Sequence, residues 1–439
     1  MKKRYVKYVS QNIMGMIGTS AYILADTFFI SRAAGADGIA ALNLVLPIYS
    51  LIFAIGAMIG IGSATRFKVQ RARGEKEAEL YFSNSVYFCL LIGVVFILAG
   101  IFVPGKILII LGADEVIVRV GTPYTRIFLL FTPFFMLNYV FSAFVRNDEN
   151  PTLAMIATFS SSIFNIIMDY VLMFPLGMGM AGAALATAFS PVVGMAICSV
   201  HFFSKKSTVK FCVRSFSLMR LVKSCGLGVS AFVGEMSSGV TTLIFNIILL
   251  RIAGNVGVAA YGIVANIALV CIAIFNGITQ GAQPLLSESY GKGDRVSLKQ
   301  LLKWSVITAF SFAVLMNVIS NWIPQEIVAV FDSEGNKEMS AYAVDGLKMY
   351  FIGFLFAGIN IVGTGYLSAT EQALGALVCS LSRGFVAISL CAVTLSSLLK
   401  MNGVWLSFPA AEVITLVIML PFLKKVLSSS SYPSGKKTW

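Results

Sequence analysis

The chain has 439 residues, of which 57% are apolar and only 12% are charged, and its net charge is +13. Soluble proteins carry about 25% charged residues, so this composition excludes an ordinary soluble domain and predicts a membrane protein crossed by many helices. The Lys and Arg residues cluster in alternate hydrophilic segments rather than in one patch. That distribution is a topology signal, and we expect no nucleic-acid partner.

Twelve apolar stretches of membrane-spanning length follow one another along the chain. The first follows a basic N-terminus (Lys2 to Lys7) and leads directly into the second, so we expect an uncleaved helix rather than a signal peptide. The expected spans are 8–31, 39–64, 81–103, 120–145, 152–174 and 181–204, then 224–252, 257–283, 300–323, 342–369, 373–397 and 402–427.

A basic, less apolar segment separates the two sets of spans. We expect an N-terminal six-helix lobe at 1–204, a cytosolic linker at 205–223, a C-terminal six-helix lobe at 224–427 and a disordered tail at 428–439. Most Lys and Arg residues lie in the two termini, the linker and the loops on the same side, which the positive-inside rule places in the cytoplasm. The predicted class is an all-α membrane protein with 12 transmembrane helices and cytoplasmic N- and C-termini.

The two halves of the chain resemble each other. When Arg32 is laid over Arg251, "RAAGADGIAALNLVLPI" aligns with "RIAGNVGVAAYGIVANI" without a gap. Gly35 then falls on Gly254, and the same register brings Gly74 onto Gly293. Repeats of six spans each have the same orientation in the membrane, so the lobes are expected to be pseudo-symmetric, an arrangement typical of transporters.

Asp26 and Asp169 are carboxylates inside apolar spans, where a charge costs about 2.5–3.5 kcal/mol on insertion scales. Counted from the span ends, both lie roughly 8–9 Å below the outer surface, as do Asn43 and Thr187. Asn165 is four residues before Asp169 and so shares its helix face. We therefore expect these five polar groups to converge in the N-terminal lobe.

Two carboxylates in a low-dielectric environment do not both ionise cheaply, so one is expected to hold a proton. Carboxylate, amide and hydroxyl oxygens also suit a hard cation such as Na⁺. The alternative is that these groups only form hydrogen bonds between helices. The residues thus predict a cation-coupling site for H⁺ or Na⁺, and no cofactor is expected unless Na⁺ is the ion bound there.

Several stretches resemble the multidrug and toxic compound extrusion (MATE) family. They are "ADTFFIS" at the end of span one, "GIAALNLVLPI" opening span two, "NIIMDYVLMFPLGMGMAGAALAT" across spans five and six, and "QGAQPLLSESYGKGD" closing span eight. The resemblance implies a multidrug efflux antiporter in the bacterial inner membrane that exports organic cations in exchange for H⁺ or Na⁺. It also implies that Asp26, Asn165, Asp169 and Thr187 are the coupling residues of the N-terminal lobe.

The C-terminal lobe carries a different polar set near the middle of its spans. Arg383 and Glu412 are expected to form a buried charge pair. Glu235 resembles the acid that the family carries in span seven, and it is a candidate for substrate binding or coupling. Further candidates are Gln280 and Gln283, which also suit helix packing and gating, and Asn360, where some family members have an acid. Gln11 and Asn12 stand where the family commonly has a proline.

Other functions were considered. No phosphate-binding loop, dinucleotide fingerprint or nucleophile motif occurs, so we expect a secondary transporter and not an enzyme. A flippase for lipid-linked sugars has the same fold, but it would need several basic residues deep in the spans, where only Arg383 is found. A non-transporting receptor would need a soluble module, and a channel would conduct without coupling. The expected partners are organic cations, H⁺ or Na⁺ and the lipid bilayer, and the expected state is a monomer.

Overall fold

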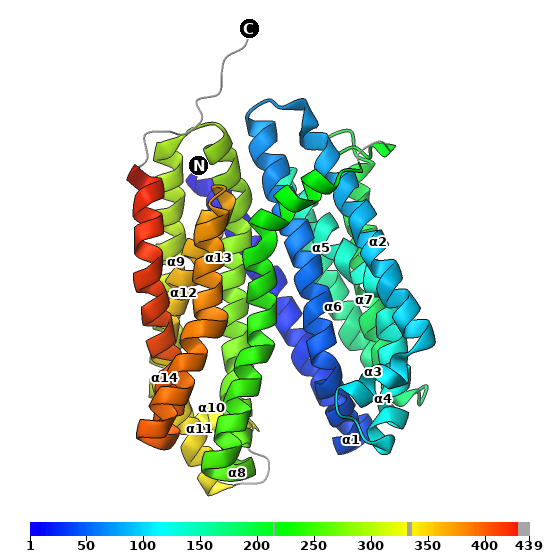
Figure 1. Ribbon diagram of the computed structural model, residues 1–439, viewed down its shortest axis with the longest axis vertical. Coiled ribbons are helices and arrows are strands. Elements are labelled where there is room, and N and C mark those ends of the chain that lie inside the picture. Colours follow the sequence, from blue (N-terminus) through cyan, green and yellow to red (C-terminus); the bar gives the residue numbers. More distant parts are fainter. Residues whose placement is uncertain (214–215, 332–335, 429–439) are drawn as a thin grey trace. The chain divides into compact units, whose positions relative to one another are not determined.

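The computed structural model describes residues 1–213, 216–331 and 336–428, and these residues form helices without any β-strand (Figure 1). The expected tail lies outside the described residues except for Ser428. The α-helices are α1 (Lys2–Ala72), α2 (Leu80–Phe102), α3 (Pro104–Ile110), α4 (Glu115–Leu130), α5 (Thr132–Asn147), α6 (Pro151–Met173), α7 (Gly179–Phe202), α8 (Leu218–Gly291), α9 (Arg295–Trp322), α10 (Pro324–Phe331), α11 (Lys337–Tyr350), α12 (Phe354–Ala369), α13 (Ala373–Leu381) and α14 (Ala387–Ser428). Short helical turns are η1 (Lys76–Glu79), η3 (Phe351–Gly353) and η4 (Ser382–Val386).

The all-helical class predicted from composition is confirmed. Among the described residues, nine helices are long and apolar enough to cross a membrane, or ten if the bent pair α4 and α5 counts as one span. Two of these stretches, Leu218–Gly291 and Ala373–Ser428, are much longer than the roughly 20 residues that one crossing needs.

The longest helices are broken at positions that the sequence repeat relates. Gly35 in α1 has φ 60° and ψ −151°, and Gly254 in α8 has φ 61° and ψ −152°. Gly74 and Gly293, which the same register pairs, also have positive φ, at 78° and 71°. Only glycine adopts such angles at little cost, which explains why these pairs are glycines in both halves.

The expected continuous span at 120–145 is wrong in detail. The helix ends at Leu130 and restarts at Thr132, with a bend of 46° between α4 and α5. Pro133 lies in the first turn of α5, where its missing N–H costs nothing, whereas it would break a continuous helix. The expected span 342–369 is likewise interrupted, by the 3₁₀ turn η3, without a proline at the break.

The expected span 373–397 contains the π-helical turn η4, which carries Arg383. A π-helical turn inserts an extra residue into an α-helix, so it re-aims the side chains that follow it, and such turns often occur at functional sites. The neighbouring Gly384 packs so closely on Ser237 of α8 that a Cβ there would overlap the serine Cβ.

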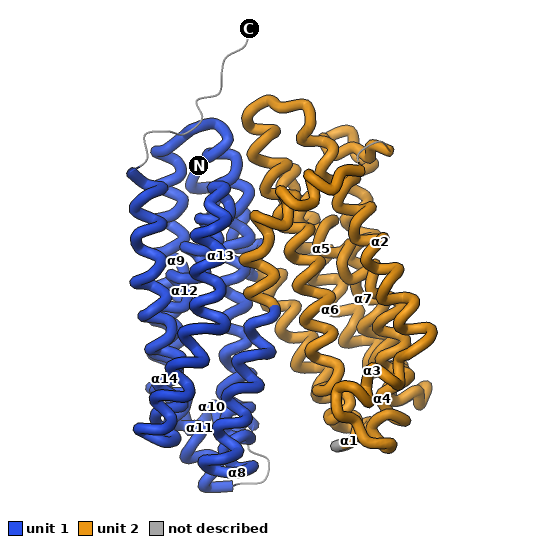
Figure 2. Tube along the Cα trace, in the orientation of Figure 1, with its two compact units in different colours: residues 1–13, 236–439 blue, residues 14–235 orange. Residues whose placement is uncertain are grey.

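The chain forms two compact units, drawn in different colours in Figure 2. Unit 1 comprises Met1–Ile13 and the chain from Met236 onward, and unit 2 comprises Met14–Glu235. Helix α1 therefore begins in unit 1 and continues in unit 2, and α8 begins in unit 2 and continues in unit 1. The lobe boundaries expected from hydropathy, at 204 and 224, remain a prediction.

Close backbone contacts at glycine hold the crossing helices inside each unit. In unit 2, a Cβ on Gly228 of α8 would overlap the carbonyl oxygen of Met58 in α1. In unit 1, a Cβ on Gly281 of α8 would lie 2.7 Å from Val9 Cα of α1. Such small-residue contacts are the usual means by which membrane helices approach one another. The pairing of α1 with α8 thus recurs in both units.

Candidate functional site

The two intramembrane aspartates come together in unit 2. Asp26 lies on the first half of α1 and is 9% exposed, and Asp169 lies on α6 and is fully buried. Their carboxyl groups lie within hydrogen-bonding range of each other. Among the described residues no donor reaches either oxygen of Asp169 or Oδ1 of Asp26. Two carboxylates repel at this range, so the contact is stable only with a proton or another cation between the oxygens.

Asn165 and Thr187 complete this cluster as the sequence predicts. Both are buried, and the Asn165 amide Nδ2 donates to Thr187 Oγ1 of α7 at 3.4 Å. The amide oxygen of Asn165 has no partner among the described residues. Asn165 and Asp169 share one face of α6 through their i, i+4 spacing. The cluster therefore presents unpartnered oxygens from two carboxyl groups and one amide in a buried environment.

Tyrosine side chains surround the cluster, and the sequence analysis missed them. The Tyr22 hydroxyl is within hydrogen-bonding range of Tyr49 and within electrostatic range of both aspartates. Tyr124 of α4 is 1% exposed and lies beside Thr187. Tyr22 could have been found, because it precedes Asp26 by four residues and so shares its helix face. The sequence around Tyr124 contains no comparable signal.

Two expected site residues lie elsewhere than predicted. Asn43 is exposed and forms no hydrogen bond with the described residues, in contrast to the four buried members of the cluster. Glu235, expected in the C-terminal lobe, is the last residue of unit 2. Its carboxylate accepts a hydrogen bond from the Tyr139 hydroxyl of α5 at 3.4 Å. Because α8 begins in unit 2, Glu235 lies with the helices of that unit, whereas hydropathy groups its span with the C-terminal set.

The two glutamines of α8 have different surroundings. Gln283 is 6% exposed and donates to Ser287 Oγ at 3.0 Å, and Ser287 donates to the carbonyl of Ala369 at the end of α12. This chain of bonds links two helices of unit 1 and fits a packing role. Gln280 is half-buried and forms no hydrogen bond with the described residues.

The second polar centre lies in unit 1. Arg383 Nε is 2.5 Å from Glu412 Oε1, and Glu412 is 1% exposed. The Asn360 amide donates to Glu412 Oε2 and to the Glu412 carbonyl, both at 2.7 Å. The three residues come from η4, α14 and α12, so the structure places the expected charge pair and the expected span-ten amide in one cluster. Both carboxylate oxygens of Glu412 are satisfied.

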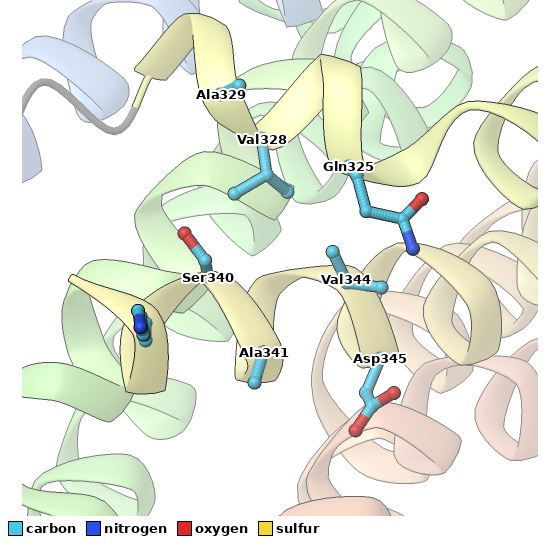
Figure 3. A pocket seen from close by; sticks show the side chains of 8 residues that line it. Gln325, Val328, Ala329, Ser340, Ala341, Val344 and Asp345 are labelled. Carbon is cyan, nitrogen blue, oxygen red and sulfur yellow. The ribbon is translucent and has the colours of Figure 1, made fainter. Parts of the chain in front are cut away.

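Two hollows open on the surface, away from these centres. One, of about 610 Å³, lies between α10 and α11 and is lined by Gln325, Val328 and Asp345 among others (Figure 3). The other, of about 550 Å³, lies between α3 and α4. Each follows a short helix at the same point of its repeat, so the hollows are a consequence of the repeated fold. Neither contains a predicted site residue.

The two polar centres have different chemistry. The centre in unit 2 offers oxygens and no basic group, which suits a proton or a monovalent cation. The described residues contain no group of three or more His, Cys, Asp and Glu that could hold a metal ion. The centre in unit 1 is an ion pair whose carboxylate is fully bonded. The buried amide oxygen of Asn360 in this centre has no partner among the described residues.

Comparison with known proteins adds a family assignment. A family model described as MatE matches residues 12–171 and 231–393. "Multidrug export protein MepA" from Staphylococcus saprophyticus is 28% identical over 410 residues, which cover 92% of this chain and 89% of the relative. The protein of the same name from Staphylococcus aureus strain MRSA252 is 26% identical over 404 residues, covering 90% and 88%.

Solved structures agree on the fold. An "outward-facing conformation of a multidrug resistance MATE family transporter of the MOP superfamily" superposes with a TM-score of 0.91 at 20% sequence identity. The superposition covers 97% of this chain and 96% of the solved chain. A MATE crystal structure "in the bent conformation" gives a TM-score of 0.87, also at 20% identity, covering 97% and 95%.

Proposed function

The chain belongs to the MatE family and is a multi-pass protein of the bacterial cell membrane, and on this premise we propose that it exports structurally varied organic cations by antiport. The observation that carries the coupling mechanism is the buried contact between Asp26 and Asp169, whose oxygens lack donors among the described residues. The curated relatives named for multidrug export support the substrate class.

We propose twelve spans with both termini in the cytoplasm. At 1.5 Å per residue, the 74 residues of Leu218–Gly291 would extend about 110 Å as one helix, several times the roughly 30 Å thickness of the hydrocarbon core. The break at Gly254 divides this stretch into two spans, and the non-helical Lys400 divides Ala373–Ser428 in the same way. With α4 and α5 as one bent span, the total is twelve.

The proposed cycle uses the acid pair as a switch. Binding of the coupling ion at Asp26 and Asp169 favours one conformation, and binding of the substrate favours the other. Such a switch requires the ion to bind the two conformations with affinities that differ by a few kcal/mol. A membrane potential supplies about 2.3 kcal/mol per charge per 100 mV, which is enough to drive export against a concentration gradient.

We propose H⁺ as the coupling ion. A single proton shared by two carboxyl oxygens satisfies the contact between Asp26 and Asp169 without further ligands. Na⁺ would need several oxygens arranged around it. Asn165 and Thr187 can contribute such oxygens, so the gradient experiment must include both ions.

The test is ethidium transport in proteoliposomes with a proton gradient and a sodium gradient imposed separately. We expect the proton gradient alone to drive accumulation, and Asp26→Asn and Asp169→Asn each to abolish it while the protein inserts and folds normally. If accumulation requires Na⁺, the coupling ion at these residues is Na⁺ and not the proton. If both variants transport as the parent protein does, the proposed coupling site is wrong.

A further inference from the structure

The segment between α7 and α8 packs along the start of α2. The Cys212 N–H donates to Ser83 Oγ at 2.7 Å, and the Ser217 N–H donates to Asn84 Oδ1, also at 2.7 Å. A backbone group of a loop in water can bond to the solvent, whereas one near the hydrocarbon core of a bilayer needs a partner in the protein. The side chains of α2 supply such partners, so this segment is suited to an apolar environment.

The contacts on α2 lie where that helix enters the bilayer. The candidate span that contains α2 runs from Lys76 to Phe102, and one crossing needs roughly 20 residues. Counted back from Phe102, the hydrocarbon core begins near Ser83. The Phe216 ring stacks on Phe88 of α2, with the ring centroids 4.8 Å apart. The segment therefore reaches the depth of the lipid headgroups and the first carbons of the acyl chains.

The exposed surface of this segment combines apolar and basic side chains. We call residues 203–213 and 216–223 the interfacial segment. Phe211, Val213 and Phe216 are each more than half exposed. The interfacial segment contains no acidic residue and five basic ones, which are Lys205, Lys206, Lys210, Arg220 and Lys223. All four lysines are exposed, whereas Arg220 lies 3.8 Å from Glu77 of η1.

We propose that the interfacial segment inserts Phe211, Val213 and Phe216 into the cytoplasmic leaflet and binds anionic phospholipids through its lysines. Apolar side chains next to lysines match the two layers of a membrane surface, because the rings enter the hydrocarbon while the long lysine stems carry their charges to the phosphates. Hydrogen bonds from Thr208 to Asp148 and from Cys212 to Ser83 hold the segment on unit 2. The interfacial segment thus attaches unit 2 to the membrane surface.

This inference goes beyond the proposed export function. Only the choice of the cytoplasmic leaflet rests on the proposed topology. The attraction itself depends on charge, since each basic residue close to an anionic leaflet adds to it and salt screens it.

The first measurement finds the depth of position 213 in lipid nanodiscs. Val213→Cys is made in the full chain with its seven native cysteines replaced by Ala, and the new thiol carries the polarity-sensitive fluorophore NBD. Phospholipids brominated on their acyl chains quench a fluorophore that contacts hydrocarbon. Val95→Cys, at an exposed position within α2, is the reference for lipid contact. Glu75→Cys, in the exposed turn between α1 and η1, is the reference for water.

We expect the fluorophore at position 213 to emit at a shorter wavelength than the one at position 75. Brominated lipid should quench it to at least about half the extent seen at position 95. Emission and quenching at position 213 equal to those at position 75 would mean that water or a partner protein covers the apolar side chains, and would overturn the proposal.

The second measurement finds which lipid lies beside the interfacial segment. The nanodiscs contain equal amounts of phosphatidylglycerol, which is anionic, and phosphatidylcholine, which is zwitterionic, and only one of the two is brominated in each sample. We expect brominated phosphatidylglycerol to quench the fluorophore at position 213 at least about twofold more than brominated phosphatidylcholine does. Equal quenching by the two lipids would overturn the proposal.

Two sets of substitutions test the lysines. The test variant neutralises three lysines of the interfacial segment through Lys205→Gln, Lys206→Gln and Lys210→Gln. The matched control neutralises three exposed lysines of the N-terminus through Lys2→Gln, Lys3→Gln and Lys7→Gln. The test variant should be quenched equally by the two lipids, and the control should keep the preference for phosphatidylglycerol. A preference that survives in the test variant would refute the role of the lysines.

Salt tests the same charges without a substitution, in case the test variant does not fold. Raising NaCl from about 0.1 M to about 1 M shortens the Debye length from about 10 Å to about 3 Å. The preference for phosphatidylglycerol should then disappear while the quenching at position 213 persists, and an unchanged preference would contradict the proposal. None of these measurements involves transport, so failure of the export proposal would leave their outcome unchanged.

Discussion

Buried polar atoms without partners are expensive, and four of those among the described residues belong to the proposed coupling site. The unsatisfied oxygens of Asp26, Asn165 and Asp169 lie together in unit 2. Each buried polar group left unpaired costs about 1–3 kcal/mol, so a cluster of several substantially destabilises the fold. A bound proton or cation removes most of that cost, which makes ligand binding and stability of unit 2 interdependent.

Thr187 tests this interpretation at a single hydroxyl. Thr187→Val keeps the shape but removes the acceptor of the Asn165 amide, so Asn165 is held less firmly beside Asp169. Interhelical bonds of this kind contribute about 0.6–1.7 kcal/mol, which predicts a roughly 3- to 20-fold weaker apparent affinity for the coupling ion. The measurement is the dependence of ethidium transport on the concentration of that ion.

Thr158→Val is the matched control for Thr187→Val. Thr158 also lies in a span of unit 2, but its hydroxyl donates only to Ala154 of its own helix. We expect its ion dependence to match that of the parent protein. An equal effect of the two substitutions would mean that the Asn165–Thr187 bond has no special part in coupling.

Asp148, just beyond the end of α5, contacts the end of α1, the end of α7 and the segment that follows α7. Its carboxylate is 2.8 Å from His201 Nε2, 2.6 Å from Arg71 Nη1, and accepts from the Thr208 N–H at 2.8 Å. Burial alone would raise the pKa of Asp148, but the hydrogen bonds from His201 and Thr208 and the charge of Arg71 lower it below the ordinary 3.8. The ionised carboxylate is therefore the form that stabilises unit 2.

The sign of the pH effect follows from this shift. A carboxyl whose pKa is lower in the folded state contributes stability above its unfolded pKa and loses it as pH falls through the folded pKa. We expect the melting temperature of the parent protein to fall below about pH 4, and Asp148→Asn to lose roughly 2–4 kcal/mol at pH 7 and to show a flatter acid limb. Thermal melting across pH 3–7 measures both. An Asp148→Asn variant as stable as the parent at pH 7 would contradict the assignment.

Helix contacts at glycine decide how closely α1 and α8 approach. Gly228→Ala would drive a methyl group into the Met58 carbonyl, so backbone must move, and we expect a loss of about 1–3 kcal/mol. Gly226, two residues earlier on the same helix, has nothing within 4 Å of an added Cβ. Gly226→Ala should be neutral or slightly stabilising, because alanine favours helix. The measurement is the melting temperature of the two purified variants. Equal melting temperatures would contradict the close contact between α8 and α1 at Gly228.

The elements differ in how far sequence predicts them. Continuous apolar spans such as α6 follow directly from hydropathy, and the break at Pro133 is recoverable because proline removes a backbone donor. The 3₁₀ turn at Phe351–Gly353 contains no proline from which it could have been predicted. The π-helical turn around Arg383 depends on contacts with other helices. Helix breaks that tertiary packing imposes cannot be predicted from the periodicity of apolar residues.

The same contrast holds at the candidate site. Asp26, Asn165, Asp169 and Thr187 were predicted to converge because charge in lipid is rare and helical spacing sets depth, and their coupling role remains a proposal. Asn43 had the right depth but is exposed, since depth does not determine which way a side chain points. Glu235 was assigned to the C-terminal lobe because hydropathy does not show that α8 starts in unit 2.

The whole-chain topology can be tested with a native cysteine. Cys212 is half-buried in the segment between α7 and α8, and its backbone N–H donates to Ser83. If that segment is cytoplasmic, a membrane-impermeant maleimide should label Cys212 in inside-out vesicles and not in intact cells, in a variant whose other six cysteines are replaced by Ala or Ser. Leu176→Cys in the same background, at the opposite ends of α6 and α7, should show the reverse pattern. Labelling of both positions from one side would exclude the twelve-span topology.

Neither half of the sequence contains a complete compact unit, and this has a consequence for assembly. Residues Met1–Ile13 pack in unit 1, where Gly277 would place a Cβ 2.7 Å from Ile13 Cα, while the first part of α8 packs in unit 2. A chain divided between Val213 and Phe216 therefore separates each unit from one of its helices. Glycine contacts of this closeness require the partner helix to be present.

We expect each fragment, when produced alone, to be degraded or to aggregate. When the two fragments are produced together, we expect them to copurify through a tag on one of them. The reassembled protein should melt near the temperature of the intact chain. Lobes that each fold from one continuous sequence would behave differently, since either fragment alone would then be stable in detergent. Omitting residues 1–13 from the first fragment is the decisive variant. Because those residues complete unit 1, their loss should lower the melting temperature of the reassembled protein even though the cut and every remaining span are unchanged.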